Sequence, residues 1–160
     1  MNRLVEGLAW GGGAFLLFCA LQPAAGMLGP AVNVFAAAVL AFALREGERA
    51  GAVFGAACGL VMDAFSLGVF GLAGFGLTAA GFLTGYVSLK INVQTPRRTA
   101  AFLTLMAAAG LAVSVGLAAV VPGSSPPWGE GRLLAQPFVT GLLATGAYRL
   151  RKRLGTVGRT

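Results

Sequence analysis

The chain has 160 residues, of which 57% are apolar and only 11% are charged, and its formal net charge is +7. Soluble domains carry about 25% charged residues, so a soluble globule of this size could not cover so much apolar surface. The positive charges stand in short clusters between apolar runs without interleaved aromatic residues, which argues against a nucleic-acid partner. The chain has no histidine, so the usual catalytic base and metal ligand is absent.

The composition instead predicts one compact membrane domain. Mean hydropathy is +0.81, and Gly accounts for 25 of the 160 residues, roughly twice its usual share of about 7%. Glycine lets transmembrane helices approach one another closely, whereas it weakens a helix in water. Cys19 and Cys58 lie inside apolar runs without metal-ligand spacing, so we expect them to be small buried side chains.

The first apolar block predicts two membrane helices, since a span needs roughly 20 apolar residues. The block covers residues 4–44 and is interrupted by the Pro- and Gly-rich segment 21–30, which predicts helices at about 4–21 and 29–44. A signal peptide is disfavoured because the chain stays apolar beyond the first of them. The charged segment 45–49 is expected to be a loop.

The rest of the chain predicts four more helices. They are expected at about 50–65, 70–89, 99–121 and 132–149. A short turn at 66–69, a polar loop at 90–98 and a Pro-, Gly- and Ser-rich loop at 122–131 separate them, and Trp128 in the last loop is a plausible interfacial anchor.

The basic residues predict the orientation of this six-helix bundle. With a cytoplasmic N-terminus, 11 of the 12 basic residues fall on the inner side, and Arg132 alone falls on the outer side. The positive-inside rule therefore places both termini in the cytoplasm, whereas an odd number of helices would scatter the charges. We expect one transmembrane domain at 1–150 and a basic, frayed cytoplasmic tail at 151–160. Each basic residue there would contribute about 1 kcal/mol of attraction to anionic lipids of the inner leaflet.

Asp63 is the single charged residue of segment 50–89, and two interpretations compete for it. A carboxylate within a membrane segment costs roughly 2.5–3.5 kcal/mol and usually faces protein. In the structural interpretation, which we favour, it accepts backbone N–H groups from the start of the next helix or pairs with Arg132. In the functional one it carries protons or a substrate, which requires further polar groups along the path. The polar residues that the first, second and fifth helices offer are few: Asn33, Thr104 and Ser114.

Glycines recur at four-residue spacing in two of the predicted helices. Gly51, Gly55 and Gly59 precede Asp63 at this spacing and share one helix face, and Gly81 and Gly85 repeat it. Such faces allow close helix packing. We expect them to pack the third and fourth helices together within the chain, and the alternative is that they receive a partner's helix.

Motifs for catalysis are missing from the sequence. There is no serine-nucleophile motif, Walker loop or metal-ligand cluster, and the glycines at 71–76 open an apolar helix with no strand before them. The four other acidic residues fall at span ends or in loops, so no buried carboxylate pair is evident. We therefore expect neither enzymatic activity nor a cofactor.

One segment of about thirty residues carries a recognisable arrangement of glycines around Asp63. It reads Gly55-Ala-Ala-Cys-Gly59-Leu-Val-Met-Asp63-Ala-Phe-Ser, then Gly68-Val-Phe-Gly71-Leu, then Gly81-Phe-Leu-Thr-Gly85-Tyr. This segment resembles the rod shape-determining MreD family, and the chain length, helix number and cytoplasmic tail are also similar. The resemblance makes Gly59, Asp63, Gly71 and Gly85 family-type positions, none of them catalytic.

The resemblance implies a multi-pass protein of the bacterial cytoplasmic membrane that serves the cell-elongation complex, or elongasome, in peptidoglycan synthesis. It implies a non-enzymatic scaffold acting with an MreC-like protein, and with RodA, a class B penicillin-binding protein and MreB in the wider complex. It also implies a six-helix fold like that of the substrate-binding subunits of energy-coupling-factor transporters. Two alternatives remain: a vitamin-type binding subunit of such a transporter, which needs a polar and aromatic cavity, and a small proton-coupled exporter using Asp63.

Overall fold

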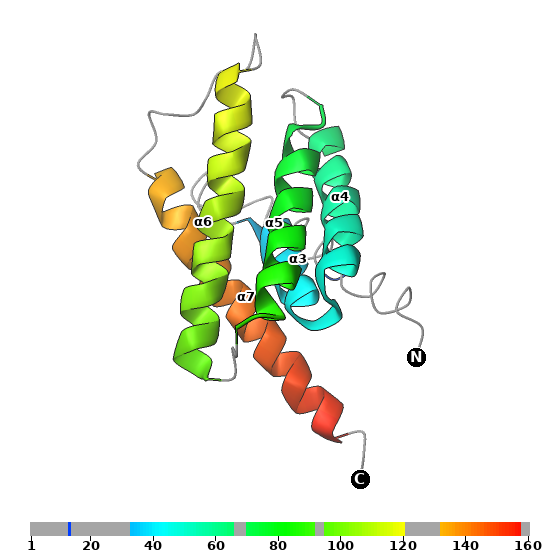
Figure 1. The fold of residues 1–160 in the computed structure, drawn as a ribbon, viewed down its shortest axis with the longest axis vertical. Coiled ribbons are helices and arrows are strands. Elements are labelled where there is room, and N and C mark those ends of the chain that lie inside the picture. The colour runs from blue at the N-terminus through cyan, green and yellow to red at the C-terminus, as the bar shows by residue number, and fades with distance from the viewer. Residues whose placement is uncertain (1–12, 14–32, 66–69, 92–94, 121–131, 158–160) are drawn as a thin grey trace.

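The structure, a computed structural model, describes residue 13 and residues 33–65, 70–91, 95–120 and 132–157 (Figure 1). This part of the chain forms helices and no strands, which confirms an all-helical fold for the residues described. The helices are α3 (Val34–Glu46), α4 (Glu48–Phe65), α5 (Leu72–Ser88), α6 (Pro96–Val120) and α7 (Arg132–Val157). The predicted first helix at 4–21, the turn at 66–69 and the loop at 122–131 lie outside the described residues.

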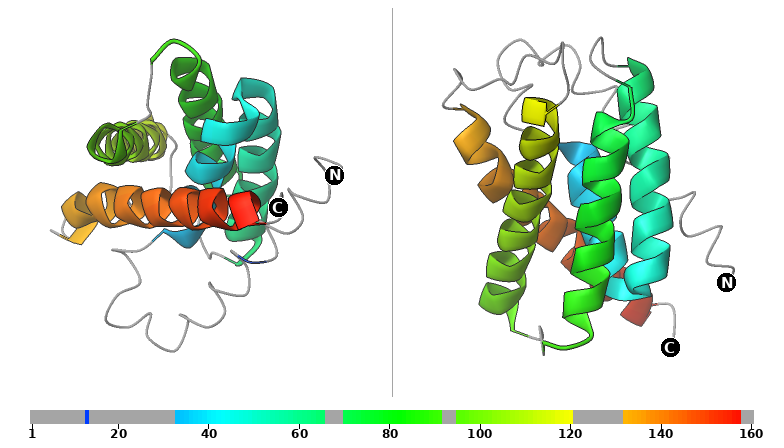
Figure 2. Two further views of the ribbon diagram at one scale, coloured as in Figure 1. Left: turned by 90° about the horizontal axis from the view of Figure 1, so that it is seen from below. Right: turned by 45° about the horizontal axis from the view of Figure 1, so that its top comes forward.

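α3 is the central helix of the bundle, and α4, α5, α6 and α7 surround it (Figures 1 and 2). Its sequence is apolar on every side, and nine of the ten residues from Val34 to Ala43 are buried. A helix that is apolar all round is stable only in such an interior position. α4, α5 and α6 alternate in direction, and α7 crosses them at a steep angle (Figure 1).

The connection between α3 and α4 corrects the predicted loop at 45–49. α3 continues to Glu46 and α4 begins at Glu48, so Gly47 alone connects them. Gly47 has a φ of 88°, a left-handed value that glycine adopts at little cost, and its N–H donates to the carbonyl oxygen of Ala43 at 3.0 Å. Charged side chains at helix ends reach solvent without unwinding the backbone, which is why the charges did not mark a loop.

Other helix ends also differ from their predicted positions. Asn33 caps α3, its Oδ1 accepting the N–H of Ala36 at 2.8 Å, so this helix begins after the predicted residue 29. α6 begins at Pro96, because proline suits the first turn of a helix. α7 continues to Val157, so the backbone predicted to fray beyond 150 is helical up to that residue. Lys and Arg are good helix formers and favour a helix C-terminus.

The bundle buries an apolar core that includes Val39, Leu40 and Leu103, and it also has hydroxyl and carboxylate side chains inside and large apolar side chains outside. Thr84, Thr140 and Asp63 are buried. Exposed side chains include Val53, Leu60, Phe65, Phe75, Phe82, Leu105, Phe138 and Leu142. Soluble monomers rarely expose apolar surface on this scale, whereas small residues at helix contacts are typical of membrane bundles.

α6 is the described helix that is long and apolar enough to cross a membrane, over Arg97–Val120. α5 is also apolar, at 17 residues. In this part of the chain, length and composition therefore identify one candidate span.

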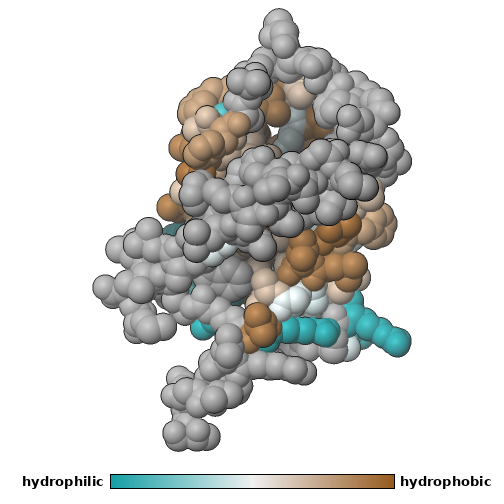
Figure 3. Space-filling model, turned by 180° about the vertical axis from the view of Figure 1, so that it is seen from behind, coloured by the Kyte–Doolittle hydropathy of each residue, from teal (hydrophilic) through white to brown (hydrophobic). Residues whose placement is uncertain are grey.

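Basic side chains gather at one end of the bundle. Because the helices alternate in direction, Arg45, Arg49, Lys90 and Arg98 all lie at the lower end in Figure 1, where α3 and α5 end and α4 and α6 begin. Figure 3 shows hydrophilic side chains at this level, with patches of apolar side chains above them where described residues are visible. The Lys90 Nζ lies 4.6 Å from the centre of the Tyr86 ring. Asp63 lies at the opposite end, near the end of α4.

Candidate functional site

The glycine faces of α4 and α5 pack against each other within the chain, as the favoured interpretation expected. A Cβ on Gly51 would lie 2.6 Å from the carbonyl oxygen of Gly81. On Gly55 it would collide with the carbonyl group of Leu77, and on Gly59 it would collide with the backbone of α5. The two backbones are thus in direct contact at three successive turns, and any side chain there would force them apart.

The contact reaches the basic end of the hairpin as well. A Cβ on Gly85 would collide with the backbone of Gly47 and Glu48, at the turn where α4 begins. The close approach therefore extends over about two thirds of α4, from Glu48 to Gly59. Such a contact holds two helices in one register, since a shift by one residue would bring a side chain into it.

Asp63 closes this contact at its other end. This residue is 4% exposed, and its Oδ2 accepts the backbone N–H groups of Gly71 at 3.0 Å and Gly74 at 2.9 Å. Its Oδ1 accepts the N–H of Ala73 at 3.1 Å. The first N–H groups of a helix have no partner within the helix, and a negative charge is favourable there. The predicted bonds from Asp63 to the start of the next helix are therefore present.

Gly71 explains why the cap of α5 comes from another helix. It occupies the N-cap position with a φ of 96°, where glycine is tolerated, and it has no side chain to cap the helix itself. Asp63 on α4 supplies the missing acceptor. Asp63 and Gly71 together thus form a helix cap that joins the end of α4 to the start of α5.

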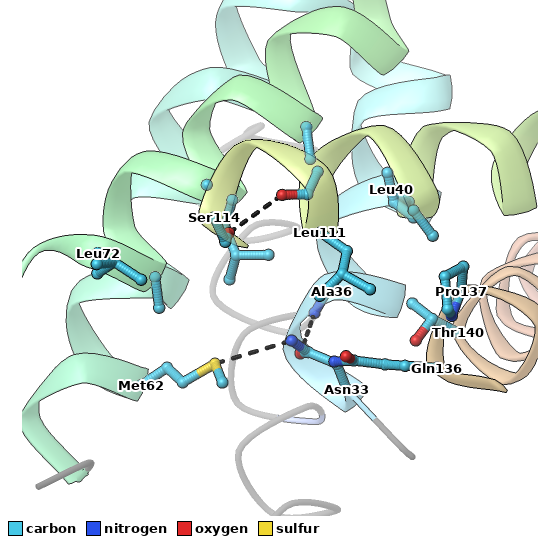
Figure 4. Close-up of a pocket in the computed structure, with 16 residues that line it drawn as sticks. Asn33, Ala36, Leu40, Met62, Leu72, Leu111, Ser114, Gln136, Pro137 and Thr140 are labelled. Carbon is cyan, nitrogen blue, oxygen red and sulfur yellow. Dashed lines mark hydrogen bonds between the residues drawn. The ribbon is translucent and has the colours of Figure 1, made fainter. Parts of the chain in front are cut away.

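A cavity of about 200 Å³ lies next to this cap, at the end of the bundle opposite the basic residues (Figure 4). Residues from all five described helices line it: the beginnings of α3, α5 and α7, the end of α4 and the second half of α6. Met62 and Ala73, the neighbour and one partner of Asp63, are among them. The cap therefore positions part of the cavity wall.

Polar side chains interrupt the apolar lining of the cavity. Thr140 is 1% exposed, and its hydroxyl has no hydrogen-bond partner in the part of the chain that the structure describes. The Nδ2 of Asn33 lies 3.9 Å from the sulfur of Met62. Ser114 donates to the carbonyl oxygen of Gly110 at 3.1 Å. Half-buried Gln136 extends from α7 toward Asn33 in Figure 4.

Part of this lining was predictable from the sequence. Of the polar residues singled out there, Asn33 and Ser114 both line the cavity, whereas Thr104 packs at the α6–α7 contact, where a Cβ on Gly141 would collide with it. Gln136 and Thr140 were not among the predicted polar residues. These two are four residues apart and share one face of α7, a polar pair within an apolar segment that could have identified them.

The other predicted contact of Asp63 stays a prediction. α7 begins at Arg132, but the side chain of Arg132 lies outside the described residues. Within the described residues, no group of three or more His, Cys, Asp or Glu side chains is placed to hold a metal ion.

Comparisons with protein-family models, with curated proteins and with solved structures gave no match to this chain.

Proposed function

We propose that this chain is a non-enzymatic, multi-span membrane scaffold of the bacterial cell-elongation complex, comparable to the MreD family. One observation carries the proposal: the residues behind the family resemblance coincide with the α4–α5 contact. Gly59 and Gly85 are places where the two backbones touch, and Asp63 with Gly71 forms the cap. The shared pattern thus specifies a rigid helical hairpin, which suits a subunit whose task is to present surfaces.

The membrane part of the proposal is six spans in the cytoplasmic membrane with both termini in the cytoplasm. Three features support it: the apolar exterior of the described helices, the apolar length of α6, and the gathering of Arg45, Arg49, Lys90 and Arg98 at one end. Basic residues gather on the cytoplasmic side of membrane proteins. The basic end is therefore proposed to face the cytoplasm, and the Asp63 end the outer side.

The outward face of α5 supports a role in assembly. Phe75 is 58% exposed, and Phe82 and Tyr86 stack with ring centres 6.0 Å apart on the same side of the helix. Exposed aromatic side chains on a rigid helix offer large contact areas to lipid or to a neighbouring helix. An MreC-like protein is the proposed direct partner, with RodA, a class B penicillin-binding protein and MreB in the wider complex.

The two alternatives differ in what supports them. A proton-coupled exporter would use Asp63, but both of its oxygens accept backbone N–H groups at the start of α5, which favours a structural role. A vitamin-type binding subunit of an energy-coupling-factor transporter gains support from the cavity, which presents amide and hydroxyl groups. It is the second candidate.

Affinity purification from native membranes separates the two candidates. The tagged chain is extracted in mild detergent, and co-purifying proteins are identified by mass spectrometry beside an unrelated multi-span protein with the same tag. We expect an MreC-like protein with this chain alone. Recovery of transporter components, together with tight vitamin binding by the purified chain, would instead favour the second candidate and overturn the scaffold proposal.

A further inference from the structure

We infer that the cavity among α3, α4, α5, α6 and α7 is a binding site for a neutral molecule of about one ring, carrying a carboxamide group. A scaffold does not need such a ligand, so this inference goes beyond the proposed function. It rests on three observations: an unpartnered buried hydroxyl, amide groups beside it, and a lining without charge.

The Thr140 hydroxyl is the first observation. Nearly all buried polar groups in proteins have a hydrogen-bond partner, and a buried group without one is costly. Other buried threonines of the bundle donate to the carbonyl four residues earlier, as Thr84 does to Ala80 at 2.7 Å and Thr145 does to Gly141 at 2.7 Å. Thr140 makes no such bond in the part of the chain that the structure describes, although it lines the cavity. A ligand in the cavity would supply the missing partner.

The side-chain amides beside Thr140 indicate the chemistry of that ligand. Gln136 and Asn33 line the same cavity; the Gln136 amide offers both donors and an acceptor, whereas Asn33 offers the donors of Nδ2, because its Oδ1 already accepts the N–H of Ala36. The Nδ2 of Asn33 makes a 3.9 Å contact with a sulfur atom, a weak acceptor that a better one would readily replace. A carboxamide matches such groups because it also offers donors and an acceptor together.

The lining of the cavity also indicates the charge and the size of the ligand. No charged side chain of the described residues lines the cavity, so an ion would lose its hydration without a counter-charge. Sites for drug-sized ligands measure about 300–1,000 Å³, whereas this cavity measures about 200 Å³. A single ring with one polar group is therefore the appropriate size.

Benzamide and benzoate form the test pair, since they share a shape and differ in charge. Binding is measured by titration calorimetry on the full chain in lipid nanodiscs, with empty nanodiscs correcting for partition into lipid. We expect saturable binding of benzamide and at least roughly tenfold weaker binding of benzoate. Thr140→Val, which removes the hydroxyl and keeps the shape, should weaken benzamide binding by roughly three- to tenfold.

Two further variants make the test specific to the cavity. Ala36→Leu fills the cavity from α3 and should abolish benzamide binding. Thr145→Val, on the same helix but with a hydroxyl already bonded within α7, should leave the affinity unchanged. The inference is overturned if benzamide does not bind saturably, if benzoate binds equally well, or if Thr140→Val and Ala36→Leu bind as the unmodified chain does. None of these results depends on recovery of an MreC-like protein.

Discussion

At position 63, a carboxylate on one helix takes the place of the capping side chain that the next helix lacks. Gly71 provides the left-handed turn before α5 but cannot cap it, and Asp63 accepts N–H groups from Gly71, Ala73 and Gly74 instead. Hydrogen bonds to an ionised acceptor are roughly twice as strong as neutral ones. This provides the reason for a single carboxylate in a long apolar segment, with no transport step required.

Replacement of this carboxylate tests its role as a cap. Asp63→Asn keeps the size of the side chain, but the amide nitrogen cannot accept an N–H group, so at least one bond is lost. We expect the free energy of unfolding to fall by about 1–3 kcal/mol, measured as a lower thermal unfolding midpoint of the purified protein. The matched control is Glu48→Gln in the first turn of α4, which should cost less than about 1 kcal/mol. An unchanged midpoint in Asp63→Asn would contradict the cap.

The buried threonines allow a second comparison at the residue scale. Thr84→Val removes a hydroxyl that donates to Ala80, so we expect a loss of about 0.5–1.5 kcal/mol. Thr140→Val removes a hydroxyl without a partner in the described part of the chain, so the ligand-free protein should be unchanged or more stable by up to about 1–2 kcal/mol. Both changes are measured as thermal midpoints. Equal losses in the two variants would mean that the Thr140 hydroxyl has a partner after all.

At the scale of elements, the glycine spacing predicted which helix faces meet, and the reason is local. A four-residue repeat places Gly51, Gly55 and Gly59 on one face whatever the rest of the chain does. The partner was also close in sequence, because α5 follows α4 after a short connection. The loop predicted from the charged residues at 45–49 was wrong, because Gly47 alone connects α3 and α4.

One glycine in this contact and one outside it provide a matched pair. A Cβ on Gly55 would collide with the carbonyl group of Leu77, whereas a Cβ on Gly116 in α6 would meet nothing within 4 Å. We expect Gly55→Ala to lower the free energy of unfolding by about 1–3 kcal/mol through overpacking. Gly116→Ala should be neutral or stabilise by up to about 1 kcal/mol. Thermal midpoints measure both, and equal behaviour would rule out a tight α4–α5 contact.

At the scale of the whole molecule, the basic end and the cavity end define an axis. Arg45, Arg49, Lys90 and Arg98 lie at one end, and Asp63 lies at the other. If the bundle spans the membrane as proposed, the positive-inside rule places the basic end in the cytoplasm. Under that orientation the cavity, which lies at the Asp63 end, would lie in the outer half of the bilayer.

Labelling of single cysteines tests the orientation. In a chain with Cys19→Ser and Cys58→Ala, Phe70→Cys and Ile91→Cys place a thiol at opposite ends of α5, at positions that are both exposed. We expect a membrane-impermeant maleimide to label Phe70→Cys in intact cells and Ile91→Cys only after the membrane is opened. Labelling of both positions from the same side would contradict the proposed topology, and the reverse pattern would invert it.

For the residues that the structure describes, the sequence by itself determined the helical class, the approximate helix positions, the glycine faces and the side chain that caps α5. All of these follow from short-range patterns, such as apolar run length, four-residue spacing and a charged group near a turn. Only the tertiary structure decided that Asn33 shares one cavity with Gln136 and Thr140, because α3 and α7 are far apart in the chain. Their proximity depends on how five helices pack against one another, which no local pattern encodes. For Asp63, the hydrogen bonds to the start of α5 were predictable from the nearby sequence, whereas its position beside a cavity was not.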